Sequence, residues 1–166
     1  MTGPSGSSQT ATEAGDLHGP VDVRSFEVAD EGAVVELWRR CGLVVPWNDP
    51  HHDIERKLGV QRELFLVASL DERIVGSVMS GYDGHRGSVN YLAVDPGLQG
   101  RGIGRRLMRE VEARLLELGC PKINLNVRTS NLAVMAFYES LGYSVDDVAC
   151  VSRRLVSDIP EDADGA

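Results

Sequence analysis

A glycine-rich stretch, GLQGRGIGRR at residues 97–106, limits the folds that this chain can adopt. It follows the apolar run VNYLAV at residues 89–94 and precedes a segment with apolar residues at helical spacing. The stretch is therefore predicted to be a tight turn between a strand and a helix. In such a turn, free backbone N–H groups and the positive end of the helix dipole converge on one point, which suits a phosphate group.

Two common phosphate-binding turns fit this stretch poorly. The dinucleotide fingerprint needs G-x-G-x-x-G early in a strand–helix–strand unit, whereas Gly100, Gly102 and Gly104 are two apart and lie past the middle of the chain. The P-loop needs a lysine followed by Ser or Thr, whereas Arg105 and Arg106 follow the last glycine. A third interpretation is a tight turn whose glycines only permit positive φ or close packing.

The composition fits one domain that binds a small ligand. The chain has 166 residues, of which 42% are hydrophobic and 25% charged, which suits a single hydrophobic core. Of the formal net charge of -8, residues 1–20 contribute -2 and residues 157–166 contribute -4, so the segment between them carries only -2. Because a duplex needs a broad basic face, nucleic acid is not expected as a partner.

The two ends of the chain differ in composition from the middle. Residues 1–20 are rich in Gly, Ser, Thr and Pro, and residues 157–166 are acidic, so both are predicted to be disordered tails around a domain at residues 21–156. The first twenty residues contain neither a secretion signal nor an apolar span. A cytoplasmic protein without a membrane partner is therefore expected. The three cysteines lack a CxxC pair, which argues against a disulfide framework and a zinc site.

The order of residue patterns predicts a mixed sheet with helices packed on it, in the α/β (α+β) class. Strands are expected at residues 21–28, 63–70, 73–82, 87–94 and 122–128, with one or two more within 143–156. Helices are expected from a cap at Asp30 to Cys41, from a cap at Asn48 or Asp49 to Gly59, over about 102–118, and over 131–141. Asp71-Glu72 should join the second and third strands as a hairpin.

Two motifs resemble those of the GNAT family of N-acetyltransferases. VDPGLQGRGIGRRLM resembles the family's acyl-coenzyme A binding motif, Gln/Arg-x-x-Gly-x-Gly/Ala, through Gln99, Gly102 and Gly104. NLAVMAFYESLGY resembles its C-terminal motif, in which an Asn heads a helix and a Tyr follows seven residues later, through Asn131 and Tyr138. The stretches PWNDP, DIERK and GYDGHRG look closer still to the bacterial YpeA-type acetyltransferases.

The resemblance, which covers about residues 21–155, implies acetyl transfer from acetyl-coenzyme A to a primary amine by direct attack. It implies a GNAT-like, mostly antiparallel, twisted sheet whose strands 87–94 and 122–128 splay apart, with helices on both faces. The pyrophosphate would lie on the N–H groups of the glycine-rich turn, and the pantetheine arm would bond strand 87–94. The implied cofactor-binding residues are Leu92, Ala93, Val94, Gln99, Gly100, Arg101, Gly102, Ile103, Gly104, Arg105, Asn131 and Tyr138.

Tyr138 matches the family's usual proton donor to the departing thiolate, which makes it the implied catalytic residue. Helical spacing alone would equally fit a core aromatic. The proton acceptor stays unassigned, because Asn90 and Tyr91 stand where many family members carry a glutamate. Asp83 and His85 are one alternative, a bound water is another, and the stretch GYDGHRG also fits a plain hairpin turn.

The resemblance implies that the region of the first two helices lines the acceptor cleft. The candidate substrate-binding residues are Trp47, Asn48, Asp49, Asp53, Asp83 and His85. HHDIE lacks the H-E-x-x-H arrangement and a distant third ligand, so no metal is predicted. The expected partner is a small-molecule amine or the amino group of a peptide or protein, and a homodimer fits the family. The alternatives are a non-catalytic acyl-coenzyme A sensor or scaffold with the same fold, and a dinucleotide-dependent oxidoreductase.

Overall fold

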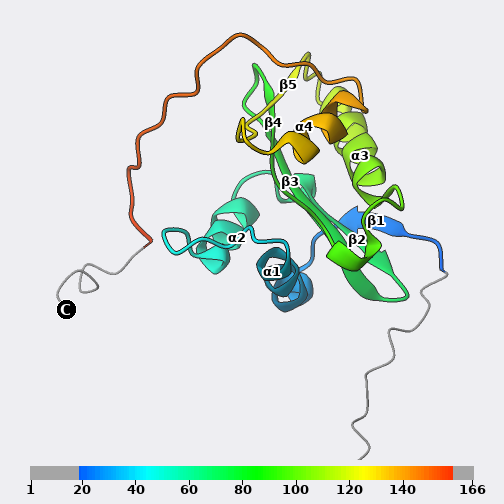
Figure 1. Cartoon of the computed structure of the whole chain (residues 1–166). Helices are drawn as coiled ribbons and strands as arrows, with labels where there is room; N and C mark the ends of the chain where they lie inside the picture. The colour runs from blue at the N-terminus through cyan, green and yellow to red at the C-terminus, as the bar shows by residue number, and fades with distance from the viewer. Residues whose placement is uncertain (1–18, 159–166) are drawn as a thin grey trace, which may run out of the picture.

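Helices cover both faces of a five-stranded sheet in the computed structural model, which describes residues 19–158 (Figure 1). The sheet order is β1-β2-β3-β4-β5, and every neighbouring pair is antiparallel except β4 and β5. The strands are β1 Asp22–Ser25, β2 Phe65–Leu70, β3 Arg73–Tyr82, β4 Gly87–Val94 and β5 Ile123–Leu125. The helices are α1 Glu31–Arg40, α2 Pro50–Leu58, α3 Ile103–Glu117 and α4 Leu132–Glu139. The predicted mixed, mostly antiparallel α/β fold is confirmed.

Two hydrophobic cores lie on opposite faces of the sheet. Strand β2 contributes to both, since Leu66 and Ala68 pack in the core with α3, and Phe65 and Val67 pack in the core with α1. A strand that is buried on both faces explains why FLVASL is almost continuously apolar instead of alternating. Helix α3 therefore covers one face, and α1 with α2 covers the other (Figure 1).

The first two helices begin in different ways. Asp49 caps α2 by accepting the His51 N–H at 2.8 Å, which decides between the two predicted caps, Asn48 and Asp49. Asp30 stands at the N-cap position of α1, but its side chain does not cap that helix and instead accepts the Arg24 guanidinium at 2.7 Å. The expected cap is wrong because a guanidinium offers this carboxylate a charge-assisted bond.

Strand β4 and strand β5 separate partway along their length. The segment Gly87–Val89 pairs with Ile123–Leu125. Strand β4 continues to Val94, and no strand of residues 19–158 pairs with its second half on this side. The backbone groups of that half are left for other partners. The splayed central strands that the family resemblance implied are therefore present.

No strand follows α4 in the described part of the chain, so the prediction of one or two strands within 143–156 is wrong. The apolar side chains Val145, Val148 and Val151 of this segment are largely exposed. An alternating pattern indicates which side chains a strand would bury. It does not show whether a neighbouring strand has a free edge with which the segment can pair. After Tyr143 the chain leaves the sheet and runs toward α2 (Figure 1).

Two outer strands are shorter than predicted. Strand β1 does not extend over 21–28, because the chain enters a 3-10 turn at Val28–Asp30. Strand β5 has three residues instead of spanning 122–128. The predicted hairpin is confirmed, since Asp71 and Glu72 join β2 to β3 with φ of +49° and +64°, the left-handed pair of a two-residue turn.

The predicted disordered tails, 1–20 and 157–166, lie almost wholly outside the described residues, and the domain limits 21–156 stay a prediction. Asp158 corrects that prediction in part, because its carboxylate forms an ion pair with Arg56 and is not a solvated tail residue. Within residues 19–158, no helix has the length and apolar character needed to cross a membrane.

A buried hydrogen bond between α1 and β3 gives a stability test of this fold. The Trp38 indole N–H donates to the Ser77 hydroxyl at 2.8 Å, and both side chains are fully buried. Ser77→Ala should lower the free energy of unfolding by about 1–3 kcal/mol, because the indole N–H loses its partner without reaching water. Urea denaturation measures this loss. In a Trp38→Phe background, which lacks the indole N–H, Ser77→Ala should lower the free energy of unfolding by clearly less. An equal loss in both backgrounds would contradict the role of the hydrogen bond.

Candidate active site

A cavity of about 430 Å³ lies where β4 has left β5. It is bounded by the second half of β4, the glycine-rich turn with the start of α3, and one face of α4. Its lining residues are Leu92, Val94, Gln99, Gly100, Gly102, Ile103, Gly104, Arg105, Ala133, Val134 and Phe137. The structure thus brings together most of the residues that the family resemblance implied for the cofactor.

The glycine-rich turn is anchored at its start to helix α1. Asp95 accepts the Gly97 N–H at 3.0 Å and the Arg40 guanidinium at 2.7 Å. The Cys41 thiol donates to the carbonyl of Val94 at 3.3 Å. Desolvation disfavours the charge of Asp95, but the Arg40 guanidinium, the Gly97 N–H and nearby positive charge together outweigh it and lower the pKa of this carboxyl. The turn therefore starts from a fixed position on the sheet.

Positive φ angles allow the turn to present its N–H groups. Gly100 and Gly102 have φ of +77° and +81°, a conformation that side chains rarely adopt. The first helical hydrogen bond of α3 joins the Arg106 N–H to the Gly102 carbonyl at 3.0 Å. The N–H groups of Ile103 and Gly104, one turn earlier, consequently have no intrahelical partner. They lie at the end of the cavity that these residues line.

The charge at this helix end favours an anion. The first turn of α3 carries Arg105 and Arg106 and no acidic residue. Cations at a helix N-terminus oppose the helix dipole, at a cost of about 0.3–1 kcal/mol each. A bound phosphate would reverse this conflict, because the dipole, the N–H groups and the guanidinium groups all attract it. In this structure Arg105 also bonds the carbonyl and hydroxyl of Ser140, at 3.4 and 3.3 Å.

Helix α4 supplies cavity residues that sequence reasoning missed: Ala133, Val134 and Phe137. A Cβ on Gly104 would lie 3.2 Å from the Phe137 ring, so this glycine allows α3 and α4 to approach closely. The sequence does contain a pattern that indicates them: Val134 and Phe137 are three residues apart, so they lie on one face of the predicted helix.

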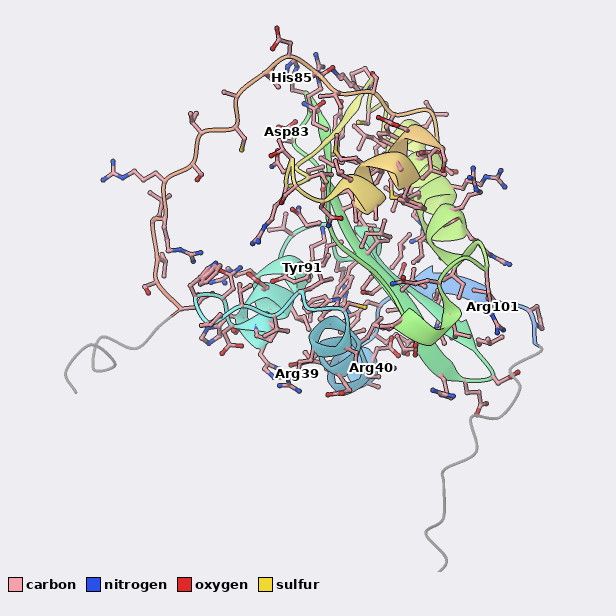
Figure 2. All side chains as sticks on the ribbon, viewed as in Figure 1. Arg39, Arg40, Asp83, His85, Tyr91 and Arg101 are labelled. Atoms are coloured by element: carbon pink, nitrogen blue, oxygen red, sulfur yellow. The ribbon has the colours of Figure 1, made fainter. Side chains whose placement is uncertain are left out.

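Four of the implied cofactor residues do not line the cavity. Ala93 is buried in the core on the opposite face of β4. Arg101 is exposed on the outside of the turn (Figure 2). Asn131 uses its side chain to cap α4, accepting the Val134 N–H at 3.3 Å. Tyr138 is buried beside the cavity-lining Phe137, with ring centroids 5.2 Å apart.

Tyr138 keeps an unused hydroxyl in an apolar setting. Its side chain is 8% exposed and lies between Phe137 and Tyr143, whose ring centroid is 5.5 Å away. Its hydroxyl bonds none of the residues between 19 and 158. Burial raises the pKa of Tyr138 to about 12, because the phenolate would be desolvated. The group therefore stays protonated, and able to donate, over the whole neutral and moderately alkaline range.

The predicted acceptor residues separate into two places. Trp47, Asn48, Asp49 and Asp53 lie at the start of α2, where Trp47 is 48% exposed and the Asn48 amide donates to Asp53 at 3.3 Å. Asp53 also accepts the Tyr91 hydroxyl, from the same stretch of β4 that lines the cavity.

Asp83 and His85 lie elsewhere, at the tip of the β3–β4 hairpin (Figure 2). Asp83 accepts the N–H groups of His85 and Arg86 at 2.7 and 2.6 Å, so it stabilises the turn. The 8 residues of strand β4 lie between this turn and the glycine-rich turn. Each residue of a strand adds about 3.3 Å, so the two turns are far apart. Asp83 and His85, named above as one alternative for the proton acceptor, therefore lie at the end of β4 away from the glycine-rich turn. Asp83 lines a second hollow, of about 460 Å³, with Gln61 and Asn124.

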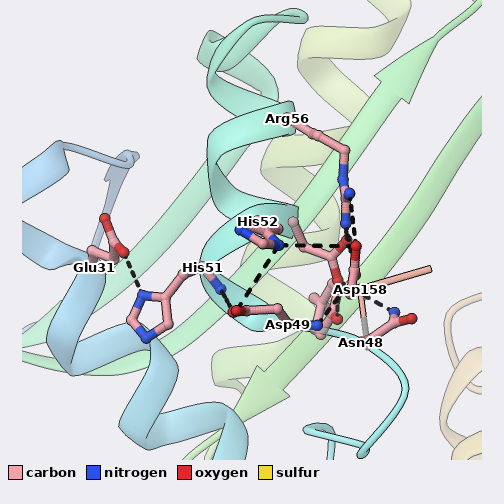
Figure 3. Close-up of polar contacts among 9 residues, drawn as sticks. Glu31, Asn48, Asp49, His51, His52, Arg56 and Asp158 are labelled. Carbon is pink, nitrogen blue, oxygen red and sulfur yellow. Dashed lines mark hydrogen bonds and ion pairs between the residues drawn. The ribbon is translucent and has the colours of Figure 1, made fainter. Parts of the chain in front are cut away.

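The C-terminal segment returns to α2 and is attached there (Figure 3). Asp158, whose side chain is 4% exposed, accepts both guanidinium nitrogens of Arg56, at 3.0 and 2.9 Å, and the Asp49 N–H at 3.2 Å. The pairing with Arg56 lowers the pKa of Asp158 to about 2. Arg154 donates to the Asn48 side chain at 2.9 Å. The C-terminal segment thus binds the start of α2 at two points, Asn48 and Asp49.

The His51 side chain pairs with Glu31 of α1, and not with Glu55 as a metal site on α2 would require (Figure 3). Among residues 19–158, no group of three His, Cys, Asp or Glu side chains is arranged to hold a metal ion.

Residues 32–143 match the acetyltransferase (GNAT) family. The chain belongs to the GNAT family. An acetyltransferase of Pectobacterium atrosepticum is 51% identical to this GNAT chain over 138 residues, which cover 83% of this chain and 98% of the relative. The family and this relative support an acyltransferase.

Solved structures agree with this GNAT fold. The ribosomal-protein-S18-alanine N-acetyltransferase of Escherichia coli superimposes with a TM-score of 0.63 at 26% identity, covering 74% of this chain and 77% of that one. AAC(6')-Iy, solved with the bisubstrate analogue CoA-S-monomethyl-acetylneamine, superimposes with a TM-score of 0.69 at 16% identity, covering 83% and 100%. The second likeness shows the fold alone.

The attachment of the C-terminal segment can be tested by proteolysis. Asp158→Ala removes the ion pair with Arg56, so trypsin should cleave at Arg153 and Arg154 several times faster than in the wild type. Because the folded-state pKa of Asp158 is about 2, below its unfolded value, the protection should be full at neutral pH and lost only as the pH falls toward 2. Amide hydrogen exchange follows this loss, because trypsin is inactive in acid. Asp147→Ala, in the same exposed segment, is the control; equal cleavage of both variants would contradict the attachment.

Proposed function

We propose that this protein transfers an acetyl group from acetyl-coenzyme A to a primary amine, by direct attack in a ternary complex. The observation that carries this proposal is the cavity between the unpaired half of β4 and the glycine-rich turn. It offers an anion site at one end and free strand backbone along one wall. A ligand with a diphosphate and an amide-bearing arm fits this arrangement.

The residues of the cavity suit the two parts of the donor. The free N–H groups at the start of α3 and the nearby guanidinium of Arg105 would hold the pyrophosphate. The backbone of Leu92 and Val94 would bond the pantetheine arm as a neighbouring strand would. A strand N–H near Leu92 would polarise the thioester carbonyl, and a donor of this kind contributes about 3 kcal/mol of transition-state stabilisation.

Tyr138 is proposed as the proton donor to the leaving thiolate. It lies beside the cavity wall, has an unused hydroxyl, and keeps its proton because burial raises its pKa to about 12. The reaction forms the C–N bond of the amide and breaks the C–S bond of the thioester. The tyrosine neutralises the thiolate as it departs.

The acceptor is proposed to be a small-molecule amine or an amino group of a peptide or protein, entering from the α1 and α2 face of the sheet. The E. coli S18-alanine N-acetyltransferase acts on a ribosomal protein, which keeps protein amino groups among the candidates. The alternative is a non-catalytic acyl-coenzyme A sensor or scaffold, because β4 carries Asn90 and Tyr91 in place of a carboxylate.

A screen of amine classes tests the function. Purified protein and acetyl-coenzyme A are mixed with amino-terminal peptides, lysine peptides, polyamines and aminoglycosides, and free thiol and acetylated product are measured. Saturable thiol release with matching product is expected for at least one class. Tight coenzyme A binding without release for any class would favour the sensor, and saturable binding of a nicotinamide cofactor without coenzyme A binding would favour an oxidoreductase.

Removing the proposed proton donor should affect turnover and not binding. Tyr138→Phe should lower kcat by about 10²–10⁴-fold and leave the acetyl-coenzyme A Kd within about twofold, since the ring is kept and only the donated proton is lost. In the wild type, no fall in kcat due to this group should appear below about pH 11, because its pKa is about 12. Unchanged kcat in the variant would remove Tyr138 from the mechanism.

Adding an anion at the turn should abolish donor binding. Gly102→Asp places a carboxylate at the helix start and should weaken acetyl-coenzyme A binding by more than about 100-fold, through repulsion of the phosphates. Gly119→Asp is the control, because Gly119 has a similar φ of +78° with open space around it, at the other end of α3. Calorimetry measures both Kd values. Normal affinity in Gly102→Asp would place the phosphates elsewhere.

A further inference from the structure

One step of the proposed function, the removal of a proton from the amine, needs an acceptor group. A free lysine amine has a pKa of about 10.4, so nearly all of it is protonated at neutral pH. Strand β4 carries no carboxylate of its own. The structure nevertheless brings a carboxylate to this strand from helix α2.

The place where it arrives is a bulge in β4. Opposite β3, Ala93 pairs with Ser77 and Asn90 pairs with Met79, so β4 holds one extra residue between these pairs. Tyr91 lies in that bulge with φ of +51°. For an aromatic residue such a conformation is unfavourable and is kept only when its surroundings enforce it. The next residue, Leu92, lines the donor cavity.

The surroundings of Tyr91 hold its side chain on the acceptor face. Its ring stacks on Trp38, with centroids 4.1 Å apart and planes 20° from parallel. Trp38 is fixed in turn by its bond to Ser77, which lies 3.4 Å from the Tyr91 carbonyl. The Tyr91 hydroxyl donates to Oδ2 of Asp53 at 2.6 Å. The half-buried Tyr91 therefore joins the bulge to the carboxylate.

Asp53 shares its nearest cation with a second carboxylate. Arg56 donates to its Oδ1 at 3.0 Å, but the same guanidinium is also bound by Asp158, so one cation is shared by two carboxylates. His52 lies 3.9 Å from Asp158, and the neutral Asn48 amide is the remaining neighbour, 3.3 Å from Oδ2. The Asp53 side chain is 19% exposed, so a ligand can reach it.

We propose that Asp53 binds the ammonium group of the acceptor and accepts its proton, and that Tyr91 is the positioning residue that holds this carboxylate beside the bulge. The inference rests on the proposed function. The ammonium gives one proton to the Asp53 carboxylate. The neutral nitrogen then forms the C–N bond as the C–S bond breaks, and the thiolate takes the proton of Tyr138. The nitrogen of the new C–N bond then releases its second proton to solvent. Solvent also removes the proton from Asp53 and returns one to Tyr138, so the net products are the amide, the free thiol and one proton.

A carboxylate in this place also selects the class of acceptor. It attracts a cationic primary amine and gives no such help to an amine that is already neutral. Hydroxylamine is neutral at pH 7 and is therefore the discriminating probe, used beside the best protonated amine of the screen, with its uncatalysed reaction subtracted.

The test is Asp53→Asn, which keeps the size of the side chain and removes its basicity. At pH 7 its kcat/KM for the protonated amine should fall by about 10²–10⁴-fold. The loss should shrink by about tenfold for each unit that the pH rises toward the amine pKa of about 10.4, because solvent then removes the proton. Transfer to hydroxylamine and the Kd for acetyl-coenzyme A should change by less than about threefold. Glu55→Gln, an exposed carboxylate on the same helix, is the matched control and should behave as the wild type.

Tyr91→Phe is the second variant, used also if Asp53→Asn does not fold. It should lower transfer to the protonated amine by about tenfold, retain the wild-type pH dependence and spare hydroxylamine, since the base remains but is less well held. An equal loss for both acceptors at every pH, or no loss, would overturn the role of Asp53. A wild-type protein that binds acetyl-coenzyme A but acetylates neither acceptor would overturn the proposed function itself.

Discussion

The separation of β4 from β5 is the constraint on which the rest of the site depends. Three residues of each strand are paired, and beyond Val89 no strand of residues 19–158 lies beside β4 on its β5 edge, although β3 still pairs with its other edge. Unpaired backbone in a sheet interior is costly unless something satisfies it. Here the glycine-rich turn and α4 close around the gap without filling it, which leaves a cavity walled by strand backbone. A ligand with its own amide groups can complete the sheet at this position.

Local preferences are broken repeatedly near this gap, between Tyr91 and Arg106. An aromatic residue has positive φ, and a helix begins with two arginines against its dipole. Each departure costs stability, and each is held by packing elsewhere: Trp38 beneath Tyr91, and Arg40 on Asp95 before the turn. Such concentration of unfavourable choices is expected where a binding or catalytic site has been placed on a stable scaffold.

The features that could be predicted from the sequence are the local ones. Pro50 and Gly59 mark the ends of α2, and Asp71-Glu72 marks a hairpin, because these residues act on their own backbone. The splay of β4 was reached only through the family resemblance, since it depends on strands far apart in the chain. The alternation in 143–156 led to a wrong prediction because pairing needs a free edge, which no local pattern reports. Within the site, no sequence pattern links Asp53 to Tyr91, because the two residues are 38 positions apart and their hydrogen bond depends on the fold.

The attachment of Asp158 has a practical consequence for work with this protein. The last described residue lies against α2, on the side proposed for acceptor entry, so a peptide or fluorophore fused to the carboxyl end is tethered to that side through residues 159–166. Such an addition could compete with the acceptor for space or supply a lysine as an unintended one. A fusion at the amino end joins the described domain through β1, the edge strand three positions from β4, and not through the segment bound to α2.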